Sequence, residues 1–155
     1  MEIDCRPAGP GDVEVLSGLV TRARDHLGSV RGGEALLDAL RAGPDPVSFA
    51  RSDTPPSGAH MVWCAAIDDV IVGYCSATVE AEHDDRVVLV REVWVEPDAR
   101  EVGAGEALVS AAMAWAIAEE ATAIDAWALP GARELKNLFE RLGLTARLLT
   151  VRRSL

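Results

Sequence analysis

Three apolar, β-branched segments follow one another in the middle of the chain, separated only by short polar turns. Asp68 and Asp69 separate the first two segments, a pattern typical of a hairpin, and a polar turn over 82–86 precedes the third. Strands joined by turns this short pair antiparallel, which excludes the strand–helix alternation of a Rossmann-type sheet. The three predicted strands are Met61–Ile67, Val70–Val79 and Val87–Val95.

Helical patterns and further strands flank this meander. The Pro-rich stretch Pro44–Gly58 predicts an exposed loop without regular structure. Since 155 residues suit one compact domain, we predict a single domain over 1–155, with a mixed α/β sheet and helices on both faces. In chain order, the other predicted elements are a strand Ile3–Arg6, a helix with Asp12 as N-cap, a helix Gly33–Leu40, a helix Glu106–Glu119, a strand Ala123–Leu129, a helix from Pro130 and Gly131 through Leu142, and a strand Leu148–Val151.

The charge and cysteine content limit the classes of ligand and the cellular location that we expect. A net charge of −10 argues against nucleic acid as a partner and favours a cationic small molecule or peptide amine, although solubility alone also explains an acidic surface. The sequence has no secretory signal and no apolar run of the roughly 18 residues needed to span a bilayer. Cys5, Cys64 and Cys75 are odd in number and lack metal-ligand spacing, so we expect a cytoplasmic protein with reduced, buried cysteines and no metal.

The segment Arg100–Gly105 (Arg-Glu-Val-Gly-Ala-Gly) lies between a predicted strand and a predicted helix. A glycine-bearing turn at a helix N-terminus directs several backbone N–H groups to one spot and favours a negative charge there. Gly103 and Gly105 let the backbone approach an anion, and Arg100 can add a charged hydrogen bond. The segment therefore predicts a phosphate site. It lacks the lysine of a P-loop, and ordinary tight turns also use Gly-x-Gly.

The residues around Arg100–Gly105 make the prediction of a phosphate site more specific. Arg100–Gly105 resembles the acyl-CoA loop of the GNAT superfamily of N-acyltransferases, with Gln or Arg, two residues, Gly, one residue, then Gly or Ala. Residues 93–97 (Val-Trp-Val-Glu-Pro) resemble that family's fourth strand. Residues 137–144 (Asn-Leu-Phe-Glu-Arg-Leu-Gly-Leu) resemble its signature near the last helix. The element order is similar over nearly the whole chain, and the sharp motifs lie within 93–144.

The resemblance implies a GNAT-like fold with a mostly antiparallel sheet, in which the parallel fourth and fifth strands splay apart. It implies acetyl-CoA as co-substrate, with no metal, and direct transfer of an acetyl or other acyl group to a primary amine of a small molecule or protein. A homodimer paired through the predicted strand Leu148–Val151 is a separate expectation from the sequence. The implied cofactor-binding residues are Val93, Trp94, Val95, Arg100, Glu101, Val102, Gly103, Ala104, Gly105 and Phe139.

Direct transfer needs a proton acceptor for the amine and a donor to the thioester oxygen. Strand alternation places Glu92 and Trp94 on one face, so Glu92 is the candidate general base. The backbone N–H of Val95 is the candidate oxyanion donor. A salt-bridged strand carboxylate is the competing interpretation of Glu92, with Glu80, Glu82 and His83 as fallback bases.

Two positions depart from the family pattern. Phe139 stands where many members carry a tyrosine that protonates the leaving thiolate, and Ala132 stands where many carry an asparagine that contacts the cofactor. Tyr74, the only tyrosine, is a candidate substitute acid. The missing acid leaves two alternatives to an acetyltransferase open: a catalytically weak acyl-CoA-binding regulatory module, and a partner-binding domain without CoA affinity. The sequence leaves the acceptor and the oligomeric state undetermined.

Overall fold

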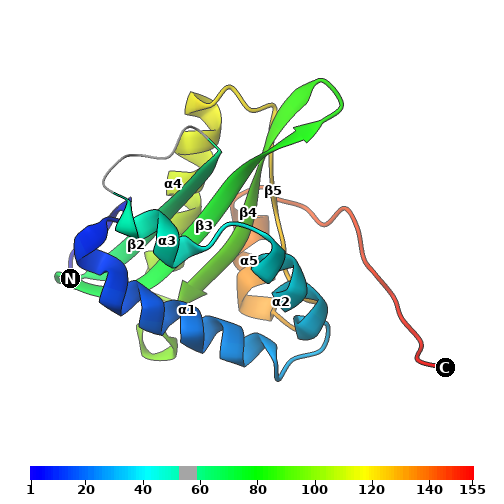
Figure 1. Cartoon of the computed structure of the whole chain (residues 1–155), viewed down its shortest axis with the longest axis horizontal. Helices are drawn as coiled ribbons and strands as arrows, with labels where there is room; N and C mark the ends of the chain where they lie inside the picture. The colour runs from blue at the N-terminus through cyan, green and yellow to red at the C-terminus, as the bar shows by residue number, and fades with distance from the viewer. Residues whose placement is uncertain (53–58) are drawn as a thin grey trace.

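The computed structural model describes residues 1–52 and 59–155, and within them the chain forms one five-stranded sheet with helices on both faces (Figure 1). The strands are β1 (Ile3–Pro7), β2 (His60–Ile67), β3 (Val70–Glu82), β4 (Asp85–Val95) and β5 (Ala123–Ala126). The helices are α1 (Val13–Leu27), α2 (Gly33–Ala42), α3 (Pro46–Arg51), α4 (Ala104–Ala118) and α5 (Arg133–Arg141), with 3-10 turns at Pro10–Asp12 and Pro97–Ala99.

The sheet is mixed, as the sequence predicts. Its order is β1-β2-β3-β4-β5, with antiparallel pairing from β1 to β4 and a parallel pair β4–β5. Asp68 and Asp69 both have positive φ, 47° and 69°, which matches the right-handed twist that a tight hairpin turn requires. The predicted meander and its first turn are therefore confirmed.

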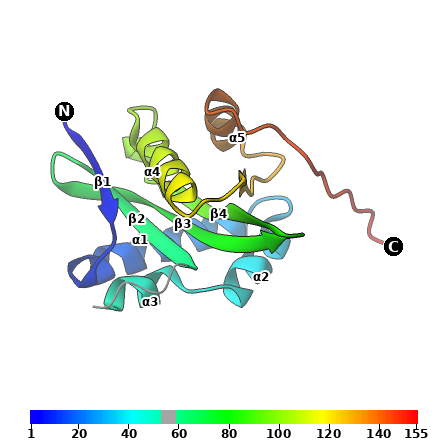
Figure 2. The same ribbon diagram turned by 90° about the horizontal axis from the view of Figure 1, so that it is seen from above.

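The two faces of the sheet carry different helices. Seen from above, α1, α2 and α3 lie on one side and α4 and α5 on the other (Figure 2). Leu16, Leu19 and Val20 of α1 are buried with Tyr74 of β3 on the first side. On the second side, α4 buries Ala104, Leu108, Ala112 and Ala116, which recur every fourth residue and form one face of the helix. Small alanines on that face let α4 lie close to the sheet.

The Pro-rich segment is not wholly irregular, because it contains α3. Asp45 caps this helix by accepting hydrogen bonds from the backbone N–H groups of Val47 and Ser48. Pro46 follows at the first helical position, where its missing N–H costs nothing, and it is buried. The prediction of a loop is wrong for Pro46–Arg51, and its part over 53–58 lies outside the described residues.

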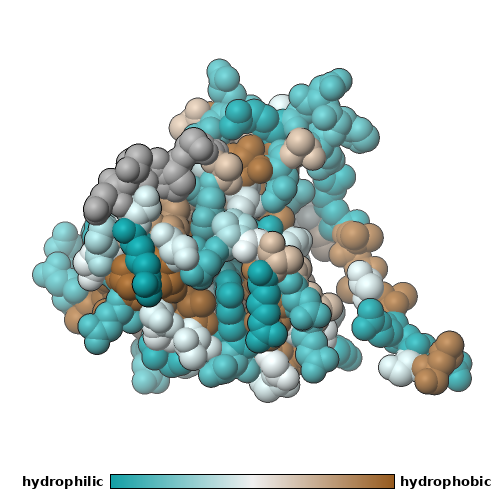
Figure 3. Space-filling model, in the orientation of Figure 1, coloured by the Kyte–Doolittle hydropathy of each residue, from teal (hydrophilic) through white to brown (hydrophobic). Residues whose placement is uncertain are grey.

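The predicted strand Leu148–Val151 is also wrong. Residues 145–155 form no helix or strand and extend away from the body (Figure 1). Leu148, Leu149 and Val151 are exposed on this tail, which carries hydrophobic surface clear of the domain (Figure 3). An apolar, β-branched stretch favours a strand only where a partner edge is available, and the tail lies against none. Pairing across a dimer stays a prediction.

Two details concern helix starts. Asp12 is the N-cap residue of α1, as predicted, but its side chain makes no capping hydrogen bond, because its carboxylate binds the Arg6 guanidinium, at 2.7 and 2.8 Å, and the Gly9 N–H. Helix α4 begins at Ala104, inside the glycine-bearing segment and not after it. In the part of the chain that the structure describes, no helix is both long and apolar enough to cross a membrane.

Candidate active site

Strands β4 and β5 separate in the middle of β4. Their register pairs 87–90 with 123–126 and goes no further. On the other side of β4, Ser76 pairs with Glu92 and Ala77 pairs with Val90, so Arg91 is the extra residue of a β-bulge. A bulge bends the strand and increases its twist. The edge of β4 beyond Val90 is therefore left open on the β5 side, as expected for splayed strands.

The alternation of the β3–β4 pair determines which backbone groups face this opening. Glu96 donates its N–H to Val72 O on β3, at 2.8 Å. Because successive residues of a strand direct their backbone groups to opposite edges, Trp94 also faces β3, whereas Val93 and Val95 face the opening. The Val95 carbonyl on that side accepts a hydrogen bond from Arg100 Nε, at 2.8 Å. The N–H groups of Val93 and Val95 point the same way.

The glycine-bearing segment forms the N-terminal turn of α4. Gly103 is the N-cap, with φ of 102°, and its carbonyl accepts the first helical hydrogen bond, from Ala107 N. The N–H groups of residues 104–106 therefore have no intrahelical partner. Glu101 also has positive φ, 64°, so the turn contains two left-handed residues that aim backbone N–H groups inward. This geometry suits an anion such as a diphosphate.

A side chain at Gly103 or Gly105 would also come close to neighbouring side chains. A Cβ on Gly105 would lie 3.1 Å from the Leu138 side chain of α5, and one on Gly103 would lie 3.3 Å from the Ile3 side chain. The close approach of α5 to the start of α4 depends on Gly105, and that of β1 depends on Gly103. They serve the packing of the site as well as any anion.

A cavity of about 1080 Å³ joins the opening between the strands to both faces of the sheet. The α4 and α5 side contributes Arg100, Glu101, Gly103, Gly105, Glu106, Arg133, Glu134, Leu138 and Arg141. The α1 and α2 side contributes His26, Leu27, Val30, Arg31, Leu36 and Leu40. The strands contribute Tyr74, Arg91, Glu92, Val93, Trp94 and Val95, and Trp127 follows directly after β5. Two ligands entering from opposite faces would meet at β4.

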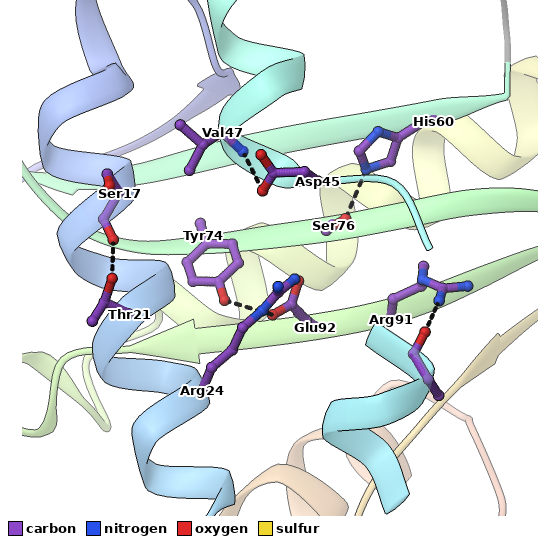
Figure 4. A network of polar contacts seen from close by, with 11 residues as sticks. Ser17, Thr21, Arg24, Asp45, Val47, His60, Tyr74, Ser76, Arg91 and Glu92 are labelled. Carbon is purple, nitrogen blue, oxygen red and sulfur yellow. Dashed lines mark hydrogen bonds and ion pairs between the residues drawn. The ribbon is translucent and has the colours of Figure 1, made fainter. Parts of the chain in front are cut away.

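Glu92 lies in this cavity within a buried polar cluster (Figure 4). Arg24 of α1 donates to it from Nε, at 3.1 Å to Oε1, and from Nη2, at 3.2 Å to Oε2. Tyr74 donates its hydroxyl to Oε1, at 2.9 Å. The carboxylate side chain is 7% exposed and the Arg24 side chain 19%. Burial, followed by the nearby Glu92 charge, raises the pKa of Tyr74 well above its usual value, so its hydroxyl stays protonated.

The Arg100 side chain packs against the end of β4. Its guanidinium lies 4.9 Å from the centre of the Trp94 ring, and Nη1 lies 3.6 Å from a Glu134 oxygen. The Trp94 ring in turn lies 5.7 Å from the His26 ring of α1. Arg100 and Trp94 thus connect the glycine-bearing turn with the opposite face of the sheet.

Most of the predicted site residues come together, and three do not line the cavity formed by the described residues. Val102 is exposed beside the turn, and Ala104 is buried under it. Phe139 is buried against Val109 and Leu138, so its ring faces the hydrophobic core and not the cavity. Ala132, the other departure from the family pattern, does line it.

Sequence reasoning missed Arg24 and Arg91. Arg24 lies in a helix whose apolar spacing was visible, but nothing in the sequence connects it with Glu92, 68 residues away. Arg91 could have been suspected, because a charged residue inside an apolar β-branched run is a sign of a bulge or of a functional position. Among residues 1–52 and 59–155, no cluster of His, Cys, Asp or Glu has the make-up of a metal site.

Comparison with known proteins agrees with this geometry. A solved aminoglycoside N-acetyltransferase, AAC(6')-Iy, in complex with CoA is 19% identical, with a TM-score of 0.68 and coverage of 98% of this chain and 95% of that one. An aminoglycoside acetyltransferase from an uncultured soil metagenomic sample is 16% identical, with a TM-score of 0.71 and coverage of 100% and 99%. A ribosomal-protein-alanine N-acetyltransferase from Brucella melitensis biovar Abortus 2308 is 16% identical, with a TM-score of 0.66 and coverage of 99% and 100%.

At such low identities these likenesses establish the fold. No curated protein matches the chain. The sequence model described as the acetyltransferase (GNAT) family matches residues 34–144, well over half of the chain. That match covers β4, the glycine-bearing turn and α5, the elements that build the cavity. The chain belongs to the acetyltransferase (GNAT) family.

Proposed function

We propose that this acetyltransferase moves the acetyl group of acetyl-CoA directly to a primary amine of a small molecule or protein. The observation that carries the proposal is the single cavity that reaches β4 from both faces of the sheet. It gives the cofactor a route from the α4–α5 side and the amine a route from the α1–α2 side. Both routes end beside the open edge of Val93–Val95.

The residues on the α4–α5 side fit coenzyme A. Its diphosphate would be held by the N–H groups of the turn Val102–Gly105, helped by the positive end of the helix dipole. Acetyl-CoA supplies the acyl group as a thioester when bound. The exposed edge at Val93 and Val95 offers backbone partners for an extended chain, in the way that an added strand pairs with a sheet edge.

The N–H groups of Val93 and Val95 are suited to stabilise an oxyanion. Charge builds on the thioester oxygen as an amine attacks, and preorganised donors aimed at that oxygen lower the barrier. Val95 is the donor that we assign. Val93 has the same orientation and is its alternative.

Glu92 is the assigned proton acceptor for the amine. An ionised carboxylate oxygen has about two acceptor positions. Oε1 already accepts hydrogen bonds from Arg24 and Tyr74. Among the described residues Oε2 accepts one only from Arg24 Nη2, so Oε2 has one acceptor position left. The two hydrogen bonds from Arg24 orient the Glu92 carboxylate.

A covalent acyl-cysteine intermediate has no support here. Burial raises the pKa of Cys64 to about 12, and burial also raises that of Cys75, so both remain thiols near neutral pH. Thiolates, and not thiols, are the nucleophiles. Neither cysteine lines the cavity formed by the described residues. Direct attack by the amine on the thioester is the simpler route.

One observation favours a second candidate, a catalytically weak acyl-CoA-binding regulatory module. Phe139 takes the place of the family's usual acid and is buried away from the cavity, and Tyr74, the only tyrosine, donates to Glu92. In the enzyme reading, the CoA thiolate leaves unaided and takes its proton from water.

The test is acetyl-CoA-dependent thiol release with a panel of primary amines, combined with detection of the acetylated product by mass spectrometry. Product formation with at least one amine is expected. CoA binding without product from any amine would favour the regulatory module. Absence of both CoA binding and product would remove the proposal.

A further inference from the structure

The α1–α2 end of the cavity, formed by His26, Leu27, Val30, Arg31, Leu36 and Leu40 with Arg91 and Trp127, has a charge opposite to that of the whole protein. The chain carries a net charge of −10. Yet the one charged residue that α1, α2 and the turn between them contribute to the described lining of this end is Arg31, and Arg91 of β4 lies in the same end. Glu92 is the carboxylate beside it, and two hydrogen bonds from Arg24 already offset its charge. The end is therefore apolar and cationic.

Arg91 is the buried cation of this end. Its side chain is 10% exposed, and Nη2 donates to the Ala39 carbonyl of α2, at 2.8 Å. The guanidinium lies 4.8 Å from the centre of the Trp127 ring, so it is held between α2 and the residue that follows β5. Its nearest carboxylate is Glu80, at 3.7 Å, and that oxygen also accepts a hydrogen bond from Thr78. The charge of Arg91 is thus only loosely compensated.

Arg91 also keeps unused donors. A guanidinium has five N–H groups. Among the described residues, every fully buried side-chain nitrogen or oxygen has a hydrogen-bond partner. Within the described residues no hydrogen bond involves Nε or Nη1 of Arg91, and Nη1 lies 3.7 Å from Glu80 Oε1, so neither atom is fully buried. Burial, followed by the positive charge of Arg91, lowers the pKa of neighbouring His60 to about 4.

Arg31 adds a second cation at the mouth of the same end. It lies in the turn between α1 and α2, is exposed, and has no hydrogen-bond or ion-pair partner among residues 1–52 and 59–155. A Cβ on the next residue, Gly32, would lie 3.3 Å from Leu129, so this turn packs against the segment after β5. Leu27, Leu36 and Trp127 add apolar surface to the lining of the same cavity.

We infer that the acceptor is an amine that also carries a carboxylate and an apolar body, the chemistry of an apolar α-amino acid or a short peptide made from one. Arg91, assisted by Arg31, binds the carboxylate, and the apolar lining takes the side chain. A guanidinium matches a carboxylate through paired hydrogen bonds. The inference rests on the proposed function, because it takes the α1–α2 end as the acceptor's route.

The same features disfavour a polycation. A polyamine would bring several ammonium groups to the α1–α2 end, where the described lining presents Arg91 and Arg31 and the one carboxylate beside it, Glu92, is paired with Arg24. Like charges brought together oppose binding. The acidic exterior of the protein, which suggests a cationic ligand from composition alone, is therefore misleading for this site.

The reaction balances without another reagent. The neutral amine nitrogen forms a bond to the thioester carbon, and the carbon–sulfur bond breaks. Glu92 takes the proton from the nitrogen and passes it to solvent, and CoA leaves as a thiolate that takes a proton from water. The products are an N-acetylated amino acid and CoA.

The test compares pairs of amines that differ only in the carboxylate: L-phenylalanine against 2-phenylethylamine, and L-leucine against 3-methylbutylamine, with spermidine as a polycation. A buried hydrogen bond to a charged group predicts about a 10- to 100-fold higher kcat/KM for the carboxylated member of each pair. Arg91→Gln should remove most of that ratio. Higher kcat/KM for spermidine or 2-phenylethylamine would overturn the inference and leave the proposed function standing.

Two further variants distinguish a loss of carboxylate binding from misfolding of Arg91→Gln. Arg31→Gln changes an exposed side chain without a partner in the described residues, so it should fold normally and lower the ratio by a smaller factor. Arg41→Gln, an exposed arginine on α2 outside the cavity lining, is the matched control and should keep the wild-type ratio. An unchanged ratio in both Arg31→Gln and a folded Arg91→Gln would contradict the inference.

If no amine is acetylated, the proposed function fails and binding decides the inference separately. Calorimetry on the CoA-bound protein would then compare N-acetyl-L-phenylalanine with N-acetyl-2-phenylethylamine. Tighter binding of the carboxylated compound, lost in Arg91→Gln, supports the carboxylate site. Equal or weaker binding overturns it.

Discussion

Arg24 of α1 holds Glu92 of β4 by two hydrogen bonds, of 3.1 and 3.2 Å, in a part of the molecule where the carboxylate side chain is 7% exposed. This ion pair joins the α1 layer to the strand that borders the cavity. It also orients a carboxylate beside the open edge of β4. The pair therefore links the stability of the domain to the position of the group that we assign to the proton.

The first prediction concerns stability. Arg24→Met should lower the free energy of unfolding by about 3 kcal/mol, because it leaves Glu92 buried without its compensating charge. Adding Glu92→Gln to Arg24→Met should recover part of that loss, since the unpaired charge is then gone. Urea denaturation measures both. Arg22→Met is the control: it removes an ion pair to Glu96 whose arginine side chain is 54% exposed, and should cost about 1 kcal/mol or less.

The second prediction concerns the proton. Glu92→Gln should lower turnover by about 100- to 10,000-fold, the usual cost of losing a general base, while the CoA dissociation constant changes little. Tyr74→Phe, which keeps the ring and deletes only the donor to Oε1, should have a smaller effect. A comparison of kcat across pH 6 to 9 checks both. Wild-type rates in Glu92→Gln at every pH would move the role to Glu80, Glu82, His83 or water.

The third prediction tests the anion site without disturbing its glycines, whose replacement would also displace Leu138 or Ile3. Val102→Asp places a negative charge on an exposed side chain beside the turn and should weaken CoA binding at least tenfold. Val70→Asp makes the same change at the exposed start of β3, away from the cavity, and should leave the affinity unaltered. Calorimetric titration with CoA distinguishes them, and equal affinities would count against the diphosphate assignment.

The fourth prediction concerns acid stability. Burial, followed by the charge of Arg91, lowers the pKa of His60 from its usual 6.5 to about 4. Between these values the unfolded chain binds a proton that the folded protein does not, so stability falls as the pH drops from about 6.5 towards about 4. His60→Gln should remove this part of the decline in Tm, whereas His83→Gln, in the exposed β3–β4 turn, should keep it. An identical decline in wild type and His60→Gln would contradict the assignment.

Sequence patterns predict those parts of the fold that depend on residues close together in the chain. The β-branched runs became β2, β3 and β4, the turn at Asp68 and Asp69 formed, and Gly103 took the left-handed conformation at the start of α4. The sequence pattern does not predict helix α3, because prolines near its start suggest an irregular loop. Pro46 is compatible with the first turn of a helix, and Asp45 before it is the residue that could have indicated an N-cap.

The site depends on contacts that the chain makes over long distances. The pairing of Arg24 with Glu92 follows from how α1 crosses the sheet, and no local pattern contains that information. The cationic lining follows from the bulge that turns Arg91 towards α2 and Trp127. Leu148–Val151 has the composition of a strand and lacks an edge to pair with, so composition alone gives the wrong answer there.

The last prediction concerns Phe139, which occupies the place of the family's usual acid but packs against Val109 and Leu138 and lies outside the cavity lining. Phe139→Tyr adds a hydroxyl in this apolar contact. Leaving that hydroxyl without a partner should cost about 1 to 3 kcal/mol of stability. Because the added group does not reach the cavity, turnover of the folded fraction should not rise.

Urea denaturation and steady-state kinetics on the same Phe139→Tyr preparation check both halves of this prediction. Phe139→Leu is the matched variant, since it shrinks the same side chain and offers no proton. A large gain in turnover in Phe139→Tyr, absent from Phe139→Leu, would show that the hydroxyl does reach the sulfur and that the missing acid limits the wild-type enzyme. A loss of stability at unchanged turnover would instead mean that the added hydroxyl stays in the apolar contact with Val109 and Leu138, where it cannot act as the acid.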